Sequence, residues 1–102
     1  MAVRFSPEAR DAVREKRAWW ERHRDKAPEL FRDELRDVVA KLRTAPTEGQ
    51  KYTVEAGRVI WRILMPKTRH HAYYRITSAG DVDVLTVWNA QSGAAPEFPS
   101  ST

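Results

Sequence analysis

Apolar and polar residues alternate in three short segments between Gly57 and Trp88, and each segment is rich in Val, Ile, Trp, Tyr and Thr. Pro66–Thr68 and Ser78–Gly80 separate these segments with residues that are typical of turns. This pattern predicts three consecutive antiparallel strands joined by tight connections. Tyr52–Glu55 is expected to form a further, brief strand before the first of them.

In the first half of the chain the apolar residues recur at helical spacing. The pattern predicts a helix from Pro7 to about Arg24, with Ser6 as its cap, and a second helix from Pro28 to about Leu42. A short alternating strand precedes the first helix. The apolar stripes of such a helical hairpin need a partner, so we expect the hairpin to pack on the sheet.

We therefore predict an α+β fold, in which an N-terminal short strand and a helical hairpin pack on one face of an antiparallel sheet of three to four strands. The length of 102 residues suits a single domain, which we expect to span residues 1–96. Residues 97–102 are polar apart from one phenylalanine and are expected to form a flexible tail.

The composition is ordinary for a globular protein, with 41% hydrophobic and 31% charged residues. The absence of cysteine excludes disulfides, thiolate chemistry and cysteine-type zinc sites, and the three histidines have no metal-ligand spacing. No apolar run approaches the roughly 20 residues that span a bilayer, and no secretory signal is visible. We expect a cytoplasmic protein with no metal, no cofactor and no membrane association.

The charge pattern is more informative than the net charge of +4. From Arg58 to Arg75 the chain carries five basic residues and two histidines but no Asp or Glu, whereas the helical half carries interleaved charges of both signs. Because side chains alternate along a strand, we expect one open sheet face, turned away from the helices. The residues predicted to line that face and bind a partner are Arg58, Arg62, Arg69, His71, Tyr73, Arg75, Leu85 and Val87.

Such a face suits two kinds of partner. One is nucleic acid, with arginines on phosphates and with Tyr73 or His71 available for stacking. The other is an acidic amphipathic peptide, whose carboxylates meet the guanidinium groups while its apolar side chains cover Leu85 and Val87. A third interpretation is that these are unrelated surface arginines.

The order of elements, the loop containing Pro46 and Gly49, and three passages of the sheet region resemble the RelE/ParE superfamily of bacterial toxins from type II toxin–antitoxin modules. The passages are 58–64 (RVIWRIL), 68–75 (TRHHAYYR) and 84–88 (VLTVW), and the resemblance covers about residues 2–96. It implies a small toxin that is held inactive by a cognate antitoxin. The acidic C-terminal segment of the antitoxin would wrap this chain, and operator DNA would be bound only through the antitoxin.

The resemblance also implies one of two targets: RelE-like members cut mRNA in the ribosome, and ParE-like members poison DNA gyrase. A nuclease needs cations for the scissile phosphate and a group that moves protons, and Arg58, Arg62 and His71 are the catalytic candidates. RelE-like nucleases place further Arg and Tyr residues at or after the last strand, where this chain has Asn89–Gly93. We therefore favour a ParE-like gyrase inhibitor. The alternatives are a RelE-like endonuclease and a degenerate member that only binds antitoxin.

Overall fold

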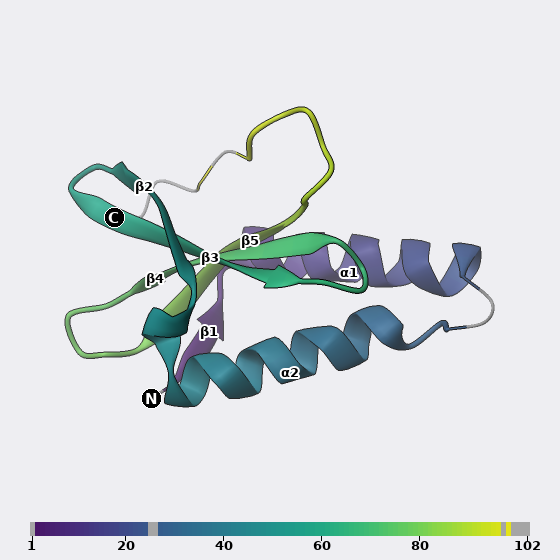
Figure 1. The fold of residues 1–102 in the computed structure, drawn as a ribbon, viewed down its shortest axis with the longest axis horizontal. Helices are drawn as coiled ribbons and strands as arrows, with labels where there is room; N and C mark the ends of the chain where they lie inside the picture. Colours follow the sequence, from purple (N-terminus) through teal and green to yellow (C-terminus); the bar gives the residue numbers. More distant parts are fainter. Residues whose placement is uncertain (1, 25–26, 97, 99–102) are drawn as a thin grey trace.

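A computed structural model describes residues 2–24, 27–96 and 98 of the chain. Two helices cover one face of a sheet whose strands lie in the order β1-β5-β4-β3-β2 (Figure 1). The elements are β1 (Val3–Phe5), α1 (Pro7–His23), α2 (Leu30–Thr44), a short 3₁₀ turn (Pro46–Glu48), β2 (Gln50–Glu55), β3 (Arg58–Met65), β4 (His70–Ile76) and β5 (Val82–Asn89). The predicted α+β fold class is confirmed. Neither described helix has the length and apolar character needed to cross a membrane.

The N-terminal strand enlarges the sheet beyond the three to four strands predicted. β1 pairs in parallel with β5 and forms one edge, so the sheet has five strands, while β2 to β5 are antiparallel as expected. The parallel pairing places Arg4 beside the start of β5, where its guanidinium group lies 2.9 Å from the carboxylate of Asp81. Sequence alternation predicted the strand but contained no information about its neighbour.

The two helices begin and end close to the predicted residues. The Ser6 side chain accepts a hydrogen bond from the Ala9 N–H at 3.0 Å, and Pro7 occupies the first helical position, as predicted. α2 begins at Leu30 and not at Pro28, because residues 28 and 29 form a turn that precedes the helix. The indole N–H of Trp20 donates to the carbonyl of Ala27 at 2.7 Å and so ties this connection to α1.

The main core lies between the helices and the sheet and is built from both. α1 contributes Ala9 and Trp20; α2 contributes Phe31, Val38 and Leu42; the sheet contributes Met65, Ala72, Tyr74, Val82, Val84 and Val87. At one end of this core the hydroxyl of Tyr74 donates to the Pro46 carbonyl at 2.5 Å. A side chain at Gly49 would come within 2.1 Å of that hydroxyl, so this close approach requires glycine.

A β-bulge in the pairing of β4 with β5 changes the expected orientation of one residue. Tyr73 pairs with Thr86 but Tyr74 pairs with Val84, so Leu85 is the additional residue. Leu85 lies on the open face, as predicted, and Asp83 pairs with Arg75, but the alternation is reset after Leu85. Val87 was predicted to line the open face; it is instead buried in the main core against the helices. Strict alternation of side chains along a strand does not predict such an inserted residue.

A buried carboxylate connects α2 to the β3–β4 turn. Glu34 is only 8% exposed. Its two oxygens accept hydrogen bonds from the Lys67 N–H at 2.6 Å, the Thr68 N–H at 2.9 Å and the Thr68 hydroxyl at 2.7 Å. Charge-assisted hydrogen bonds of this kind are among the stronger ones in proteins. The carboxylate therefore holds the turn, and through it the relative position of β3 and β4, against the helix.

We expect Glu34→Gln to lower the free energy of unfolding by about 2–3 kcal/mol, because an amide group would replace one acceptor oxygen and face the turn's own donors. Urea unfolding followed by circular dichroism measures this difference. Asp37→Asn, which makes the same chemical change on the exposed side of α2, should alter stability by less than about 0.5 kcal/mol. Equal stability of the two variants would contradict the anchoring role of Glu34.

Candidate partner-binding site

The open face of the sheet, opposite the helices, is more aromatic and less charged than the sequence predicted. Ile60, Tyr73 and Leu85 form a small buried cluster there, and Trp88 and Phe98 pack against it. The ring of Tyr73 lies 5.0 Å from that of Tyr52 and 5.3 Å from that of Phe98. Tyr73 and Leu85 are therefore on the predicted face but covered, and Tyr73 is only 3% exposed. A stacking role for Tyr73 requires the rings above it to move.

The covering residues were missed by the sequence analysis. Phe98 belongs to the tail that we expected to be flexible; residues 97 and 99–102 of that tail lie outside the described part of the structure. The segment after β5 is tied back to the sheet, because the Trp88 indole N–H donates to the Ala94 carbonyl at 3.0 Å. A phenylalanine in an otherwise polar tail was the only signal, and it says nothing about where the ring packs.

Arg62 and His71 lie together at a shallow hollow on the open face. This hollow of about 230 Å³ is also lined by Tyr52, Trp88 and the segment 92–96. The Arg62 Nε donates to the Gln50 side-chain oxygen at 3.2 Å, and the guanidinium carbon lies 4.8 Å from the centre of the Tyr52 ring. Burial, and then the positive charge of Arg62, lower the pKa of His71 below its ordinary value. The neutral form of His71 is therefore favoured in this hollow.

Two arginines of the open face have acidic residues opposite them on neighbouring strands. Arg75 pairs with Asp83 in register, and its guanidinium group lies 2.9 Å from that carboxylate. Arg58 pairs in register with Glu55 of β2. The predicted single-signed surface is thus partly neutralised. The segment from Arg58 to Arg75 indeed lacks acids, but the sheet supplies them from β2 and β5, which lie outside that segment.

Arg69 was predicted to lie on the open face, and this placement is wrong. It precedes β4 and sits in the β3–β4 turn with a φ of 63°, so strand alternation does not apply to it. Its side chain lines a cleft on the helix side of the sheet instead. Adjacent His70 and His71 do point to opposite faces, as the alternation predicted, since His70 packs against Phe31 of the main core.

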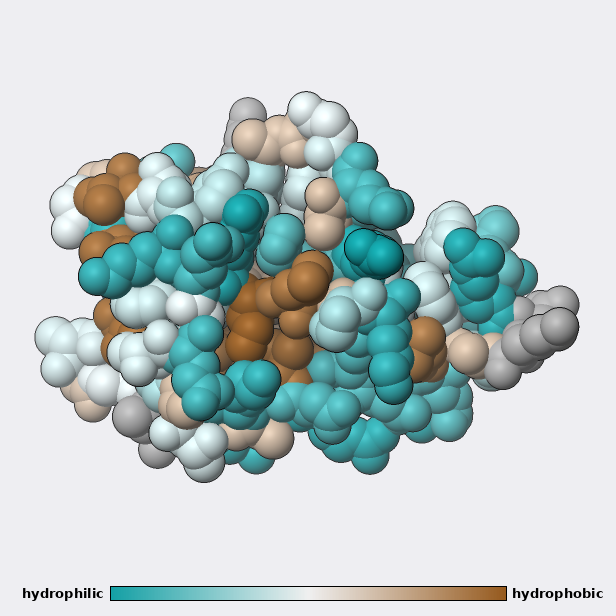
Figure 2. Space-filling view, viewed as in Figure 1, coloured by the Kyte–Doolittle hydropathy of each residue, from teal (hydrophilic) through white to brown (hydrophobic). Residues whose placement is uncertain are grey.

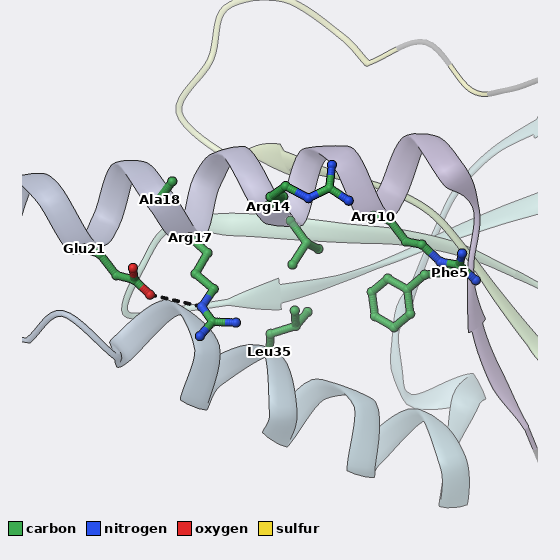
Figure 3. A pocket seen from close by; sticks show the side chains of 8 residues that line it. Phe5, Arg10, Arg14, Arg17, Ala18, Glu21 and Leu35 are labelled. Atoms are coloured by element: carbon green, nitrogen blue, oxygen red, sulfur yellow. Dashed lines mark hydrogen bonds and ion pairs between the residues drawn. The ribbon is translucent and has the colours of Figure 1, made fainter.

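A second surface with an apolar floor lies between the helices. Phe5, Val13, Ala18 and Leu35 line a groove of about 670 Å³, and the side chains of Arg10, Arg14, Arg17 and Glu21 lie along it (Figure 3). Arg17 is paired with Glu21 at 3.0 Å and Arg14 with Asp11 at 3.1 Å. On the side shown in Figure 2, apolar surface also gathers where the sheet meets α2, bordered by hydrophilic residues. The interleaved charges of the helical half gave no indication of this groove.

The comparisons with known proteins agree with this architecture. The family model described as the ParE toxin of the type II toxin–antitoxin system parDE matches residues 3–92. A solved structure of a chromosomal ParDE toxin–antitoxin system from P. aeruginosa is similar, with a TM-score of 0.70 and 12% sequence identity over 89% of this chain and 97% of that chain. A search of curated proteins found no match. The fold therefore belongs to the RelE/ParE superfamily, and the chain belongs to the ParE toxin family of type II toxin–antitoxin systems.

The proximity of Arg62 to His71 predicts how the pKa of His71 responds to a substitution. Replacement of Arg62 by glutamine removes a positive charge, so the pKa of His71 should rise; it should stay below its ordinary value because burial is the larger cause. Titration of the imidazole signals by NMR measures the shift. Arg36→Gln, on the exposed side of α2, removes the same charge far from the hollow and should leave the His71 titration unchanged. An unchanged pKa in the Arg62 variant would contradict the proximity of the two groups.

Proposed function

We propose that this toxin inhibits growth by binding DNA gyrase in the cytoplasm through its open face, and that a cognate antitoxin neutralises it. The observation that carries the proposal is the composition of that face: a hollow lined by one arginine, one histidine and three aromatic side chains, those of Tyr52, Tyr73 and Trp88. Aromatic residues and arginine are enriched where proteins bind proteins. Inhibition by binding requires a shaped surface and no catalytic group.

The same face is poorly equipped for RNA cleavage. A ribonuclease must stabilise the charge that develops on the scissile phosphate and move protons at two positions. Arg75 is engaged by Asp83, and Tyr73 is covered by Tyr52 and Phe98. No Arg, Lys, His or Tyr follows Arg75 in the sequence. These features favour gyrase over the ribosome with its mRNA as the target, and the experiment below separates the two.

The groove between α1 and α2 supports a place for the antitoxin. Its floor is apolar and arginines lie along it, and Arg10 has no ion pair among the described residues. An amphipathic segment with acidic residues at its edges matches both properties. We propose that the acidic C-terminal segment of the antitoxin fills this groove. Operator DNA would then be contacted through the antitoxin's other part and not by this chain.

Charge reversal at the open face tests the proposed toxic surface. We expect Arg62→Glu, and likewise Arg58→Glu, to abolish growth inhibition on induced expression in bacteria while the circular dichroism spectrum is retained. Lys41→Glu changes the same charge at an exposed position of α2 and should remain toxic. Full toxicity of the Arg62 variant would contradict the open face as the active surface.

The target is identified with the wild-type protein in the same cells. We expect gyrase-dependent DNA breakage with intact mRNA. Ribosome-dependent mRNA cleavage would instead support the RelE-like alternative. Absence of any growth inhibition, together with tight antitoxin binding, would support the degenerate, non-toxic alternative.

Antitoxin binding at the groove is tested separately. We expect the double variant Arg10→Glu/Arg14→Glu to bind the cognate antitoxin about tenfold more weakly, mainly through slower association and with a reduced dependence on salt. Biolayer interferometry at several salt concentrations measures both. Arg22→Glu/Lys41→Glu makes the same change of net charge at exposed positions that do not line the groove and should bind as the wild type does. Equal weakening of both variants would indicate a nonspecific effect of net charge and would contradict the groove.

A further inference from the structure

A third hollow lies beside the C-terminal half of α1; it shares no lining residue with the groove and only Asn89 with the hollow on the open face. It has a volume of about 410 Å³ and lies between α1, the β3–β4 turn and the end of β5. α1 contributes Glu15, Lys16, Trp19 and Trp20 to its lining, and Arg24 follows directly after the helix. The remaining lining residues are Lys67, Thr68, Arg69 and His70 from the turn and the start of β4, and Asn89 and Gln91 at and after the end of β5. We call it the basic cleft.

Positive charge dominates the basic cleft. Four cationic side chains line it (Lys16, Arg24, Lys67 and Arg69), but only one carboxylate, that of Glu15, does so. Within the described ranges none of these four cations has a carboxylate within 4.0 Å. The nearby carboxylate of Glu34 is already committed to the turn. Glu15 is thus the one described carboxylate in the lining, and four cations outnumber it.

Two ionisable groups in the cleft, Lys16 and His70, are partly or almost fully buried, and without a bound anion their burial is energetically unfavourable. Burial lowers the pKa of the Lys16 ammonium group, and the negative charge of Glu15 only partly opposes this effect. His70 is 7% exposed, and its Nδ1 has no hydrogen-bond partner among the described residues. Burial first, and then the charge of Lys16, lower the pKa of His70 to about 4. An anion in the cleft would offset both costs.

We propose that the basic cleft binds a phosphate-bearing ligand of about nucleotide size. A single carboxylate would offset only one of four cations, whereas a phosphate or diphosphate group carries several negative charges and accepts hydrogen bonds from lysine and arginine together. The volume lies within the range of small-ligand sites in proteins. The ligand's phosphates lie against Lys16, Lys67 and Arg69. Free nucleotides and the phosphorylated end of a nucleic acid strand share this chemistry.

Trp19 and Trp20 form part of the wall of the cleft, and we do not assign them contacts with the ligand. The Arg24 guanidinium carbon lies 5.8 Å and 5.5 Å from the ring centres of Trp19 and Trp20, and the His23 ring stacks on Trp19 at 4.5 Å. Arg24 and His23 thus already contact these rings, and stacking of a base is not part of the proposal. Trp19 remains 43% exposed at the cleft and provides a fluorescence signal for binding.

The test compares variants of the cleft with a variant of equal charge. Pyrophosphate, ADP, and a short oligothymidylate with and without a 5′-phosphate are titrated at constant ionic strength, followed by Trp fluorescence and by NMR. We expect Lys16→Gln/Lys67→Gln to weaken pyrophosphate binding at least about tenfold, because charge-assisted contacts to phosphate are lost. The control Lys41→Gln/Arg43→Gln, which removes two exposed charges from the end of α2, should bind as the wild type does. Lys67→Gln alone, at an exposed turn position, keeps the test valid if the double variant does not fold.

The possible results separate the two sources of the phosphate group, and they also show when the proposal fails. NMR changes should be centred on His70 and the β3–β4 turn, and bound pyrophosphate should raise the pKa of His70. Preference for ADP would identify a free nucleotide, and preference for the 5′-phosphorylated strand over its unphosphorylated form would identify a nucleic acid end. Three results would overturn the proposal. They are equal pyrophosphate binding by both double variants, NMR changes centred on Arg62 and His71, and loss of pyrophosphate binding when sodium chloride supplies the same ionic strength.

Discussion

The hydrogen bonds between Glu34 and the β3–β4 turn are the constraint on which the rest of the structure depends. A carboxylate that is almost fully buried is tolerated only where donors surround it, and here the turn's two N–H groups and one hydroxyl do so. This contact attaches α2 to the point where β3 reverses into β4. It thereby places His70 against Phe31 in the core and leaves His71 for the opposite face.

The open face depends on that anchor and on the bulge at Leu85. Once β3 and β4 are placed, Ile60, Arg62, His71 and Tyr73 share the open face, and the bulge lets Leu85 join them while Val87 returns to the core. The result is a cluster of rings with Arg62 beside it. Asp83 then offsets the charge of Arg75, and Glu55 lies opposite Arg58 on the neighbouring strand. The surface suits recognition of a shaped protein partner better than it suits a long stretch of phosphates.

The described residues form three surfaces that differ in charge and in apolar character. The open face is aromatic with one central arginine, the groove between the helices is apolar with arginines along it, and the basic cleft is a pocket of cations around a buried histidine. The open face and the basic cleft combine elements that are far apart in the sequence, whereas the groove uses the consecutive elements β1, α1 and α2. The helix pair and the open face lie on opposite sides of the sheet (Figure 1), so the surfaces that we propose for the target and for the antitoxin do not coincide.

The sequence by itself determined the class of fold, the positions of the helices and strands within about two residues, and the family. Helical and strand periods, the Ser6–Pro7 helix start and the turn residues are local properties, and a one-dimensional pattern records them. Only the tertiary structure decided that β1 lies beside β5, that Asp83 offsets Arg75, that Val87 faces the helices and that Arg69 joins Lys16 in a cleft. These features arise from pairing between distant strands, from a single inserted residue and from a turn, and strand alternation contains no information about any of them.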